Sequence, residues 1–289
     1  MSLDNTAEPI RWPAEAIWEA LYPRLPGFTV EVLPSIDSTN TELMRRARAG
    51  RTEPILLVAE RQTAGRGRLG RPWHGAVGDA LTFSLGLPLA PKDWSGLSLA
   101  VGVSVAESLQ PAPPEPGSAV PRIGLKWPND LWLSGDRKLA GILVETASFV
   151  AAGADGVGAA AQNPAERYVV IGIGINVRAP AGDGLSTTPG SLQMLDARWD
   201  APQALAAIAA PLVDTLLAFA AQGFAPLLPR FAQRDALRGR AVNLTDGTAG
   251  VAEGLRGDGA LLVRTAQGVS AVTSSEISVR PAAPAPVQP

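Results

Sequence analysis

Residues 54–87 read PILLVAERQTAGRGRLGRPWHGAVGDALTFSLGL, a stretch in which two apolar runs enclose a polar, glycine-rich segment. The apolar runs PILLVAE and ALTFSLGL are typical of buried strands. The segment between them contains GRGRLGRPW (65–73), where glycines alternate with arginines. Glycine permits tight turns and close approach to a ligand, and arginine offers a planar charged fork that suits carboxylates and phosphates. We therefore expect a sheet with an anion-binding loop.

This loop also admits plainer interpretations, an RGG-like contact with nucleic acid or a flexible surface loop. It does not match the phosphate-binding pattern GxxxxGK[ST], and it is not a dinucleotide-binding GxGxxG fingerprint. Its place between two strands would let three arginines close over a ligand. Closure would exclude water from a reactive intermediate and supply positive charge to a phosphate.

Outward from this stretch, apolar periodicity predicts alternating helices and strands. Helices are expected over 14–21, 39–50, 96–109 and 205–221, and further buried strands over 123–133, 139–145 and 168–177. Asn40 or Thr41 can cap the helix over 39–50, and Gly50 can end it. Residues 205–221 are the most membrane-like, but Pro211 and Asp214 interrupt them, so a buried or amphipathic helix is expected. Beyond about residue 239, short alternating runs with Asp-Gly turns predict a small antiparallel barrel or sheet.

Composition excludes several classes of chemistry. The 25 lysines and arginines nearly balance 27 acidic residues, and the net charge of −2 argues against generic binding to nucleic acid or a membrane surface. The chain has no cysteine and one histidine, His74, which excludes disulfides, thiolate nucleophiles and multi-histidine metal sites. His74 adjoins Trp73, so we expect a solvent-facing or ring-stacking role. The N-terminus has no secretory signal pattern, and a soluble, cytoplasmic protein is expected.

The segment KWPNDLW (126–132) presents polar residues at a break in an apolar run. Pro128 disfavours helix for the residue before it, so a turn is expected that exposes Lys126, Asn129 and Asp130. One interpretation is a strand-ending turn with an Asx cap. The other gives Lys126 to a phosphate and Asp130 to a magnesium ion or an arginine partner.

Two further motifs combine charge or glycine with apolar strands. Lys138 stands at the start of an apolar run that includes Gly141. This lysine is either solvated or a point charge that bridges a carboxylate and an α-phosphate. Gly172 and Gly174 alternate with isoleucines, which opens one face of a strand either to a flat ligand or to a crossing helix.

Five motifs follow one another in a recognisable order. They are SIDSTN (35–40), QTAGRGRLGR.W (62–73), KWPNDL (126–131), KLAGILVE (138–145) and GIGINV (172–177). Together they closely resemble the biotin–protein ligases, also called biotin–[acetyl-CoA-carboxylase] ligases. The later GRAVNL, GALLV and EISVR resemble that family's small C-terminal domain, so the resemblance covers roughly residues 30 to 282.

The resemblance implies an α+β fold, with a central, mostly antiparallel sheet flanked by helices as in the class II synthetases, followed by an SH3-like β-barrel. The implied domains are an N-terminal segment (1–28), a catalytic domain (29–236), an SH3-like domain (237–282) and a disordered tail (283–289). Residues 110–121 and 151–166, rich in Pro, Gly and Ala, are expected to be mobile insertions.

The reaction implied by the resemblance has two steps. The biotin carboxylate attacks the α-phosphate of MgATP, giving biotinyl-5′-adenylate and pyrophosphate. A lysine of a biotin carboxyl carrier protein, from acetyl-CoA carboxylase or another biotin-dependent carboxylase, then attacks the adenylate. ATP and Mg²⁺ are the implied cofactors.

The resemblance also assigns residues to the site, with Lys138 and Arg68 as catalytic groups. The implied biotin site consists of Ser38, Thr39, Asn40, Gln62, Arg66, Gly67, Arg68, Lys138, Gly141 and Gly172. The implied nucleotide site consists of Arg71, Trp73, Lys126, Asn129, Asp130, Asn176 and Arg280. Asp130 is the candidate metal ligand, and Leu69 departs from the family where an additional arginine can occur.

Two rival functions remain at this stage. A lipoate–protein ligase shares the fold and the adenylate chemistry, and a non-catalytic RNA-binding protein could use the arginine loop. Bifunctional members of the resembled family carry an N-terminal DNA-binding domain, but fewer than 30 residues precede FTVEVLP here. We therefore expect a monofunctional ligase that does not bind DNA or membranes, as a monomer or homodimer.

Overall fold

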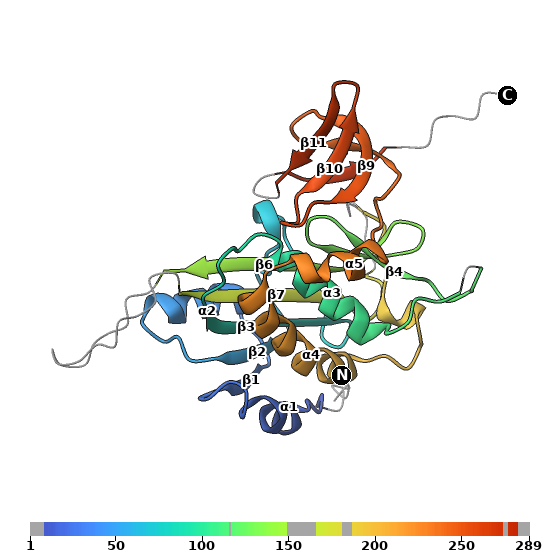
Figure 1. The fold of residues 1–289 in the computed structure, drawn as a ribbon. Helices are drawn as coiled ribbons and strands as arrows, with labels where there is room; N and C mark the ends of the chain where they lie inside the picture. Colours follow the sequence, from blue (N-terminus) through green and yellow to red (C-terminus); the bar gives the residue numbers. More distant parts are fainter. Residues whose placement is uncertain (1–8, 116, 149–165, 181–186, 274–276, 283–289) are drawn as a thin grey trace, which may run out of the picture.

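The computed structural model describes residues 9–115, 117–148, 166–180, 187–273 and 277–282, which form two sheets and their flanking helices (Figure 1). The predicted tail 283–289 and all but the last residue of the insertion 151–166 lie outside the described residues. Residues 110–121 contain no helix or strand where they are described, and Gln110 ties their two ends by donating to the carbonyl of Pro121 at 3.0 Å.

The larger sheet has seven strands in the order β1-β2-β3-β7-β6-β5-β4. Its strands are β1 (Thr29–Leu33), β2 (Ile55–Ala59), β3 (Ala80–Leu89), β4 (Ile123–Lys126), β5 (Asp130–Leu133), β6 (Arg137–Ala147) and β7 (Arg167–Asn176). Only the β1–β2 pair among these is parallel. The predicted central, mostly antiparallel sheet is therefore confirmed.

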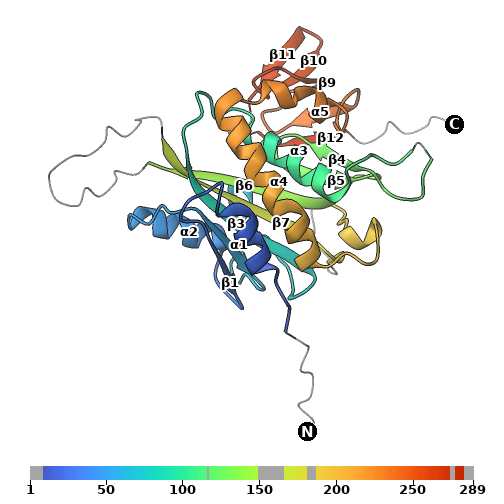
Figure 2. The same cartoon turned by 60° about the horizontal axis from the view of Figure 1, so that its bottom comes forward.

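Helices cover both faces of this sheet. They are α1 (Ala14–Leu21), α2 (Thr39–Arg48), α3 (Leu97–Leu109), α4 (Ala201–Gln222) and the short α5 (Leu228–Ala232). Figure 2 shows α1, α3 and α4 together in front of the sheet. Alternation along β2 sends Leu56 and Val58 into the core shared with these helices, and Ile55 and Leu57 into a smaller core under α2 on the opposite face.

Strand β7 has one face in the core and the other face open. Ile171, Ile173 and Ile175 belong to the core beneath α3 and α4. Because side chains alternate along a strand, Gly172 and Gly174 lie on the opposite face, the side of α2. The absence of side chains at these two positions leaves that face open to other groups.

Helix α4 is, in the described part of the chain, the one helix long and apolar enough to cross a membrane. It packs along α3 and β3, and Leu205, Ile208 and Leu212 are fully buried. The helix continues through Pro211. It agrees with the predicted buried or amphipathic helix, since one side is buried while Asp214 and Leu217 are exposed.

One local prediction was wrong. The cap of α2 is Ser38, whose side chain accepts from the Thr41 amide at 3.4 Å, rather than Asn40 or Thr41. The run 123–133 breaks at the predicted turn into the hairpin β4–β5, and Trp127 in that turn is completely buried. The turn is covered because the Trp127 indole N–H donates to the Gly259 carbonyl of the smaller sheet at 3.0 Å.

The smaller sheet has five strands in the order β11-β10-β9-β8-β12. They are β8 (Ala241–Leu244), β9 (Ala249–Leu255), β10 (Leu261–Thr265), β11 (Gly268–Val272) and β12 (Val279–Pro281). All pairings are antiparallel, which confirms the predicted small antiparallel unit. It lies beside the β4 end of the larger sheet (Figure 1).

Candidate active site

A cavity of about 870 Å³ opens on the α2 face of the sheet. The glycine–arginine loop, the hairpin β4–β5, strands β6 and β7, and β12 of the smaller sheet all contribute to its walls. Every residue that the sequence assigned to biotin, nucleotide or catalysis lines this cavity. Motifs from five separate parts of the chain thus meet at one place.

One end of the cavity is polar and nearly uncharged. The amide and hydroxyl of Thr39 donate to Gln62 Oε1 at 2.8 and 3.1 Å. Behind them the buried Ser84 hydroxyl lies 2.7 Å from Thr39 Oγ1 and 2.6 Å from Asn40 Oδ1. The Asn40 amide donates to Glu145 Oε2 at 2.9 Å. These bonds fix the rotamers of groups able to recognise a neutral polar ligand.

The strand glycines make room for protein side chains. A Cβ on Gly172 would stand 2.1 Å from Asn40 Oδ1, and one on Gly174 would stand 2.4 Å from Trp73 Cε2. Of the two interpretations of the alternating glycines, Gly172 fits the crossing helix, since Asn40 belongs to α2. Gly174 instead accommodates the indole of the loop, and a Cβ on Gly141 of β6 would stand 3.4 Å from Cζ3 of the same ring.

The glycine–arginine loop folds back on itself. The Gly67 amide donates to the Arg71 carbonyl at 2.7 Å and the Trp73 amide to the Gly65 carbonyl at 2.8 Å. Leu69 sits at the tip with φ 56° and an exposed side chain. The loop is therefore held closed at its base by main-chain hydrogen bonds.

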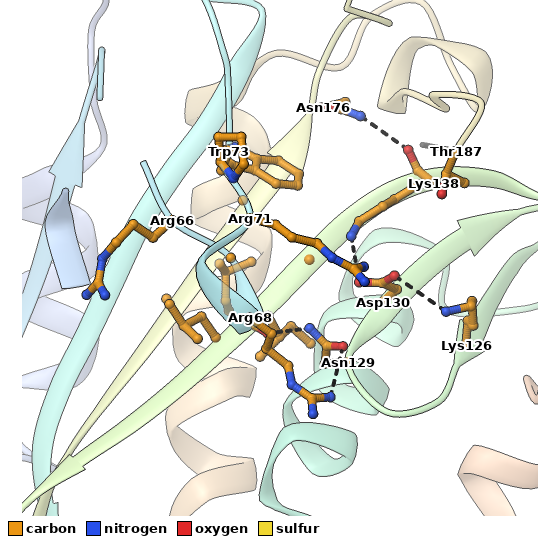
Figure 3. A pocket seen from close by; sticks show the side chains of 18 of the residues that line it. Arg66, Arg68, Arg71, Trp73, Lys126, Asn129, Asp130, Lys138, Asn176 and Thr187 are labelled. Atoms are coloured by element: carbon orange, nitrogen blue, oxygen red, sulfur yellow. Dashed lines mark hydrogen bonds and ion pairs between the residues drawn. The ribbon is translucent and has the colours of Figure 1, made fainter. Parts of the chain in front are cut away.

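The loop arginines point in different directions (Figure 3). Arg66 points away from the cationic group around Asp130, and its guanidinium contacts Thr41 Oγ1 at 3.2 Å and Glu145 at 3.4 Å. Arg68 donates to Asn129 Oδ1 at 3.4 Å, and burial lowers the pKa of its guanidinium. Arg66 thus anchors the loop to α2 and β6, whereas Arg68 faces the β4–β5 turn.

The other end of the cavity is strongly cationic. Lys138 Nζ lies 2.8 Å from Asp130 Oδ1, and Lys126 Nζ lies 3.8 Å from Asp130 Oδ2. Arg71 points toward the same carboxylate (Figure 3). Arg280 of β12 also lines the cavity, and its charge acts on Lys126 together with the charges of Lys138 and Arg71. Four cations thus share this end of the cavity with one carboxylate, and this excess positive charge suits a polyanion such as a triphosphate.

Lys126 differs from its prediction. The sequence placed it at an exposed turn, but it is only 8% exposed because the smaller sheet covers the hairpin. Burial lowers the pKa of Lys126; Asp130 opposes this shift, and the charges of Lys138, Arg71 and Arg280 add to it. A buried lysine among like charges is poised to gain from an incoming anion.

Asn176 supports the start of strand β6. Its side-chain amide donates to the Lys138 carbonyl at 3.2 Å and the Gly190 carbonyl at 3.0 Å, while the Lys138 amide donates to the Thr188 carbonyl at 2.8 Å. Asn176 therefore braces the Lys138 backbone as well as lining the cavity. His74 is exposed at the rim, as expected.

Sequence reasoning missed three groups around the cavity. Ser84 and Glu145 hold Asn40, and Asp136 lines the cavity while pairing with Arg240 of the C-terminal segment. A polar residue inside the apolar run ALTFSLGL was a usable signal for Ser84. The partners of Glu145 and Asp136 are 105 and 104 residues away, so no local pattern reveals them.

The donor set does not form a metal cage. Within the portions of the chain that the structure describes, no three His, Asp or Glu side chains converge. Asp130, the candidate metal ligand, is flanked by two lysines. Magnesium in proteins is usually held by one or two carboxylates together with water molecules. A single carboxylate that is already paired with lysines does not by itself hold a resident magnesium ion.

Comparison with known proteins agrees with this geometry. Residues 32–158 match the biotin/lipoate A/B protein ligase family, and residues 238–280 match the biotin protein ligase C terminal domain. The chain is 35% identical over 266 residues to the bifunctional ligase/repressor BirA of Escherichia coli, covering 90% of this chain and 76% of that protein.

The chain belongs to the biotin protein ligase family. Its members include the biotin–[acetyl-CoA-carboxylase] ligase of Paracoccus denitrificans, 29% identical over 85% of this chain and 98% of that protein. A solved biotin protein ligase from Aquifex aeolicus, in complex with biotin and ATP, superposes with a TM-score of 0.69 at 27% identity, covering 88% of this chain and 99% of that one. The predicted family, fold and enzyme class are therefore confirmed, and they are favoured over a lipoate ligase or an RNA-binding protein.

Proposed function

We propose that this biotin protein ligase uses the one cavity to join biotin to ATP and then passes biotin to a carrier-protein lysine. The single observation that carries the proposal is the division of the cavity into a polar, nearly neutral end and a cationic end. A neutral ring system suits the first, and the phosphates of ATP suit the second. The carboxylate that joins them would lie between, near Lys138.

In the first step, a biotin carboxylate oxygen forms a bond to the α-phosphorus of MgATP while the bond to the β-phosphate oxygen breaks and pyrophosphate leaves. Carboxylate and triphosphate repel each other, so the step needs fixed positive charge more than a base. Lys138, Lys126 and Arg71 supply that charge, and it stabilises negative charge that develops on the phosphoryl oxygens. Magnesium enters with ATP as part of the substrate.

In the second step, a neutral lysine amine of the carrier protein attacks the acyl carbon of biotinyl-5′-adenylate. The new C–N bond forms as the bond between the acyl carbon and the phosphate oxygen breaks, AMP leaves, and the nitrogen releases one proton to solvent. Until then the adenylate must be kept from water. Arg68, which faces the cavity from the loop, and Trp73, which rests on the strand glycines, are placed to cover it.

We assign the residues to two groups on this basis. Biotin would be contacted by Ser38, Thr39, Asn40, Gln62, Gly67, Arg68, Lys138, Gly141 and Gly172, and the nucleotide by Arg71, Trp73, Lys126, Asn129, Asp130, Asn176 and Arg280. Arg66 differs in role: since its guanidinium contacts Thr41 and Glu145, it would reach biotin through its backbone only. We assign Asp130 to orienting the two lysines, and a share in magnesium binding would fall to it only when MgATP is present.

The acceptor we propose is the biotin carboxyl carrier protein of a biotin-dependent carboxylase, in the cytoplasm. The biotin–[acetyl-CoA-carboxylase] ligases among its relatives are named for such a partner. The domain division we propose places the catalytic part before residue 237, because the larger unit's last helix ends at Ala232 and β8 begins at Ala241.

The test is pyrophosphate release from MgATP with biotin, lipoate or octanoate added separately. Release that depends on biotin alone is expected, and a carrier-domain lysine should then become labelled. Stimulation by lipoate instead would move the protein to the lipoate ligases. No release with any of the three would refute the adenylation chemistry.

A further inference from the structure

The C-terminal sheet reaches the cavity with one charged side chain, Arg280, and something must hold it there. Arg280 lies on β12, opposite Asn243 of β8. It belongs to the same cationic group as Lys126, Lys138 and Arg71. Like charges repel, so these cations would push β12 away from the hairpin β4–β5 when no anion lies between them.

An ion pair joins the two units next to this point. Arg240 donates from both terminal nitrogens to the two Asp136 oxygens, each at 2.7 Å. Such a two-point arrangement of guanidinium and carboxylate fixes orientation as well as distance. The pair holds the pKa of Asp136 below its ordinary value through the Arg240 hydrogen bonds, so the carboxylate is charged at neutral pH.

Asp136 and Arg240 each lie next to a strand that carries a cation of the cavity. Asp136 lies in the tight turn between β5 and β6, two residues before Lys138, and this turn is defined by left-handed backbone at Gly135 (φ 81°) and Asp136 (φ 59°). Arg240 directly precedes β8, which pairs with the strand that carries Arg280. The ion pair therefore connects the Lys138 strand to the Arg280 strand through two short, hydrogen-bonded segments.

A second polar contact adds to the attachment, which also includes apolar packing between the two units. The buried Trp127 indole N–H donates to the Gly259 carbonyl at 3.0 Å. A single attachment would leave the small unit free to turn about it, whereas two separated attachments restrict that rotation.

We infer that Asp136 and Arg240 are positioning residues that hold the C-terminal unit so that Arg280 faces the nucleotide end of the cavity. The inference rests on the proposed function. Neither residue needs to touch a substrate. Their loss should weaken ATP use and leave biotin binding intact, because the polar end of the cavity is built without the C-terminal unit.

The test compares Arg240→Gln and Asp136→Asn with wild type. Asparagine tolerates the left-handed backbone at position 136, so Asp136→Asn removes charge without adding strain. Arg230→Gln is the matched control, since it breaks another long-range pair, with Glu107, whose residues do not line the cavity. We expect the KM for ATP to rise roughly 3- to 10-fold in both test variants and not in the control, with the Kd for biotin changed by less than about twofold. Arg240→Lys, which keeps the charge but not the fork, should recover part of the loss.

A second experiment measures the position of the C-terminal unit relative to the larger unit directly. The chain has no cysteine, so Ala218→Cys on α4 and Gln267→Cys after β10 can carry spin labels without background. The distance distribution between the labels should broaden in Arg240→Gln and Asp136→Asn.

An unchanged distance distribution, or a KM for ATP no higher than in the control, would overturn the inference. Equal weakening of ATP and biotin would overturn it too, because a general loss of folding produces that result. If the wild type releases no pyrophosphate with biotin, the proposed function fails. The label distances and equilibrium binding of ATP then still decide the role of the pair.

Discussion

Gly174→Ala should release the glycine–arginine loop from the sheet, and its neighbour Gly141→Ala should not. The two glycines face each other across β6 and β7 and lie under the same Trp73 ring. A Cβ at position 174 would stand 2.4 Å from Trp73 Cε2, about 1 Å short of the 3.4 Å at which ordinary contact begins. At position 141 the nearest atom is 3.4 Å away, so alanine fits.

The size of the effect follows from which partner moves. Overpacking of this kind costs about 1–3 kcal/mol. Moving β7 would disturb its ladders to both β3 and β6, whereas Trp73 belongs to a loop and can swing out. The cost therefore falls on the closed loop, and its open population should rise about 5- to 140-fold, since 1.4 kcal/mol corresponds to a factor of ten.

Limited trypsin digestion measures this population, because Arg66 and Arg68 lie in the loop and cleavage of a fast-opening segment follows the fraction open. Gly174→Ala should be cut faster than wild type, release less pyrophosphate with biotin, and show a red-shifted tryptophan emission. Its Tm should change little. Equal cleavage of the Gly174→Ala and Gly141→Ala proteins would refute the packing of Trp73 on the strand.

Three further substitutions test the charges of the cavity. Lys138→Ala should lower biotin-dependent pyrophosphate release by about 10²- to 10³-fold with the fold intact by circular dichroism. The control is Lys92→Ala, which changes an exposed lysine outside the cavity. A near-normal rate of pyrophosphate release in Lys138→Ala would show that Lys138 has no part in the adenylation step. Arg68→Gly should speed escape of the adenylate and label bystander proteins, which an unchanged dissociation rate would contradict. Burial lowers the pKa of Lys126 from its ordinary 10.5, so its charge is present below the lowered value and lost as pH rises through it. A plot of ATP affinity against pH should therefore begin to fall below pH 10.5 as the pH is raised. In Lys126→Arg this alkaline fall should move to higher pH. If the fall occurs at the same pH in Lys126→Arg, a titratable group other than Lys126 causes it.

Local patterns were sufficient for much of the fold. The alternation of isoleucine and glycine in 168–177 predicted a strand with one open face, and β7 has isoleucines in the core and glycines at the cavity. The apolar runs on both sides of the arginine loop became β2 and β3, neighbours in the sheet. These features depend on side-chain periodicity within a few residues, which a sequence displays directly.

What the sequence could not show depends on contacts between distant parts of the chain. Lys126 looked exposed because a Pro-Asn turn follows it, yet the C-terminal unit covers that turn through Gly259. Glu145 was not assigned to the site, but it holds Asn40 and the loop arginine Arg66. Periodicity gives the face on which a residue lies and not the partner that it meets there.

The contact between Trp127 and Gly259 has a consequence for engineering. The acceptor is a main-chain carbonyl, and position 259 has φ 82°, with a Cβ there falling 2.9 Å from Leu99 Cδ1. The residue at position 259 must therefore adopt the left-handed turn and have no side chain, while its hydrogen bond uses only the main chain. Many side chains of the C-terminal unit could therefore be replaced on this catalytic body, provided that the glycine in that turn, Arg240, Arg280 and the apolar residues shared with the larger unit's core are kept.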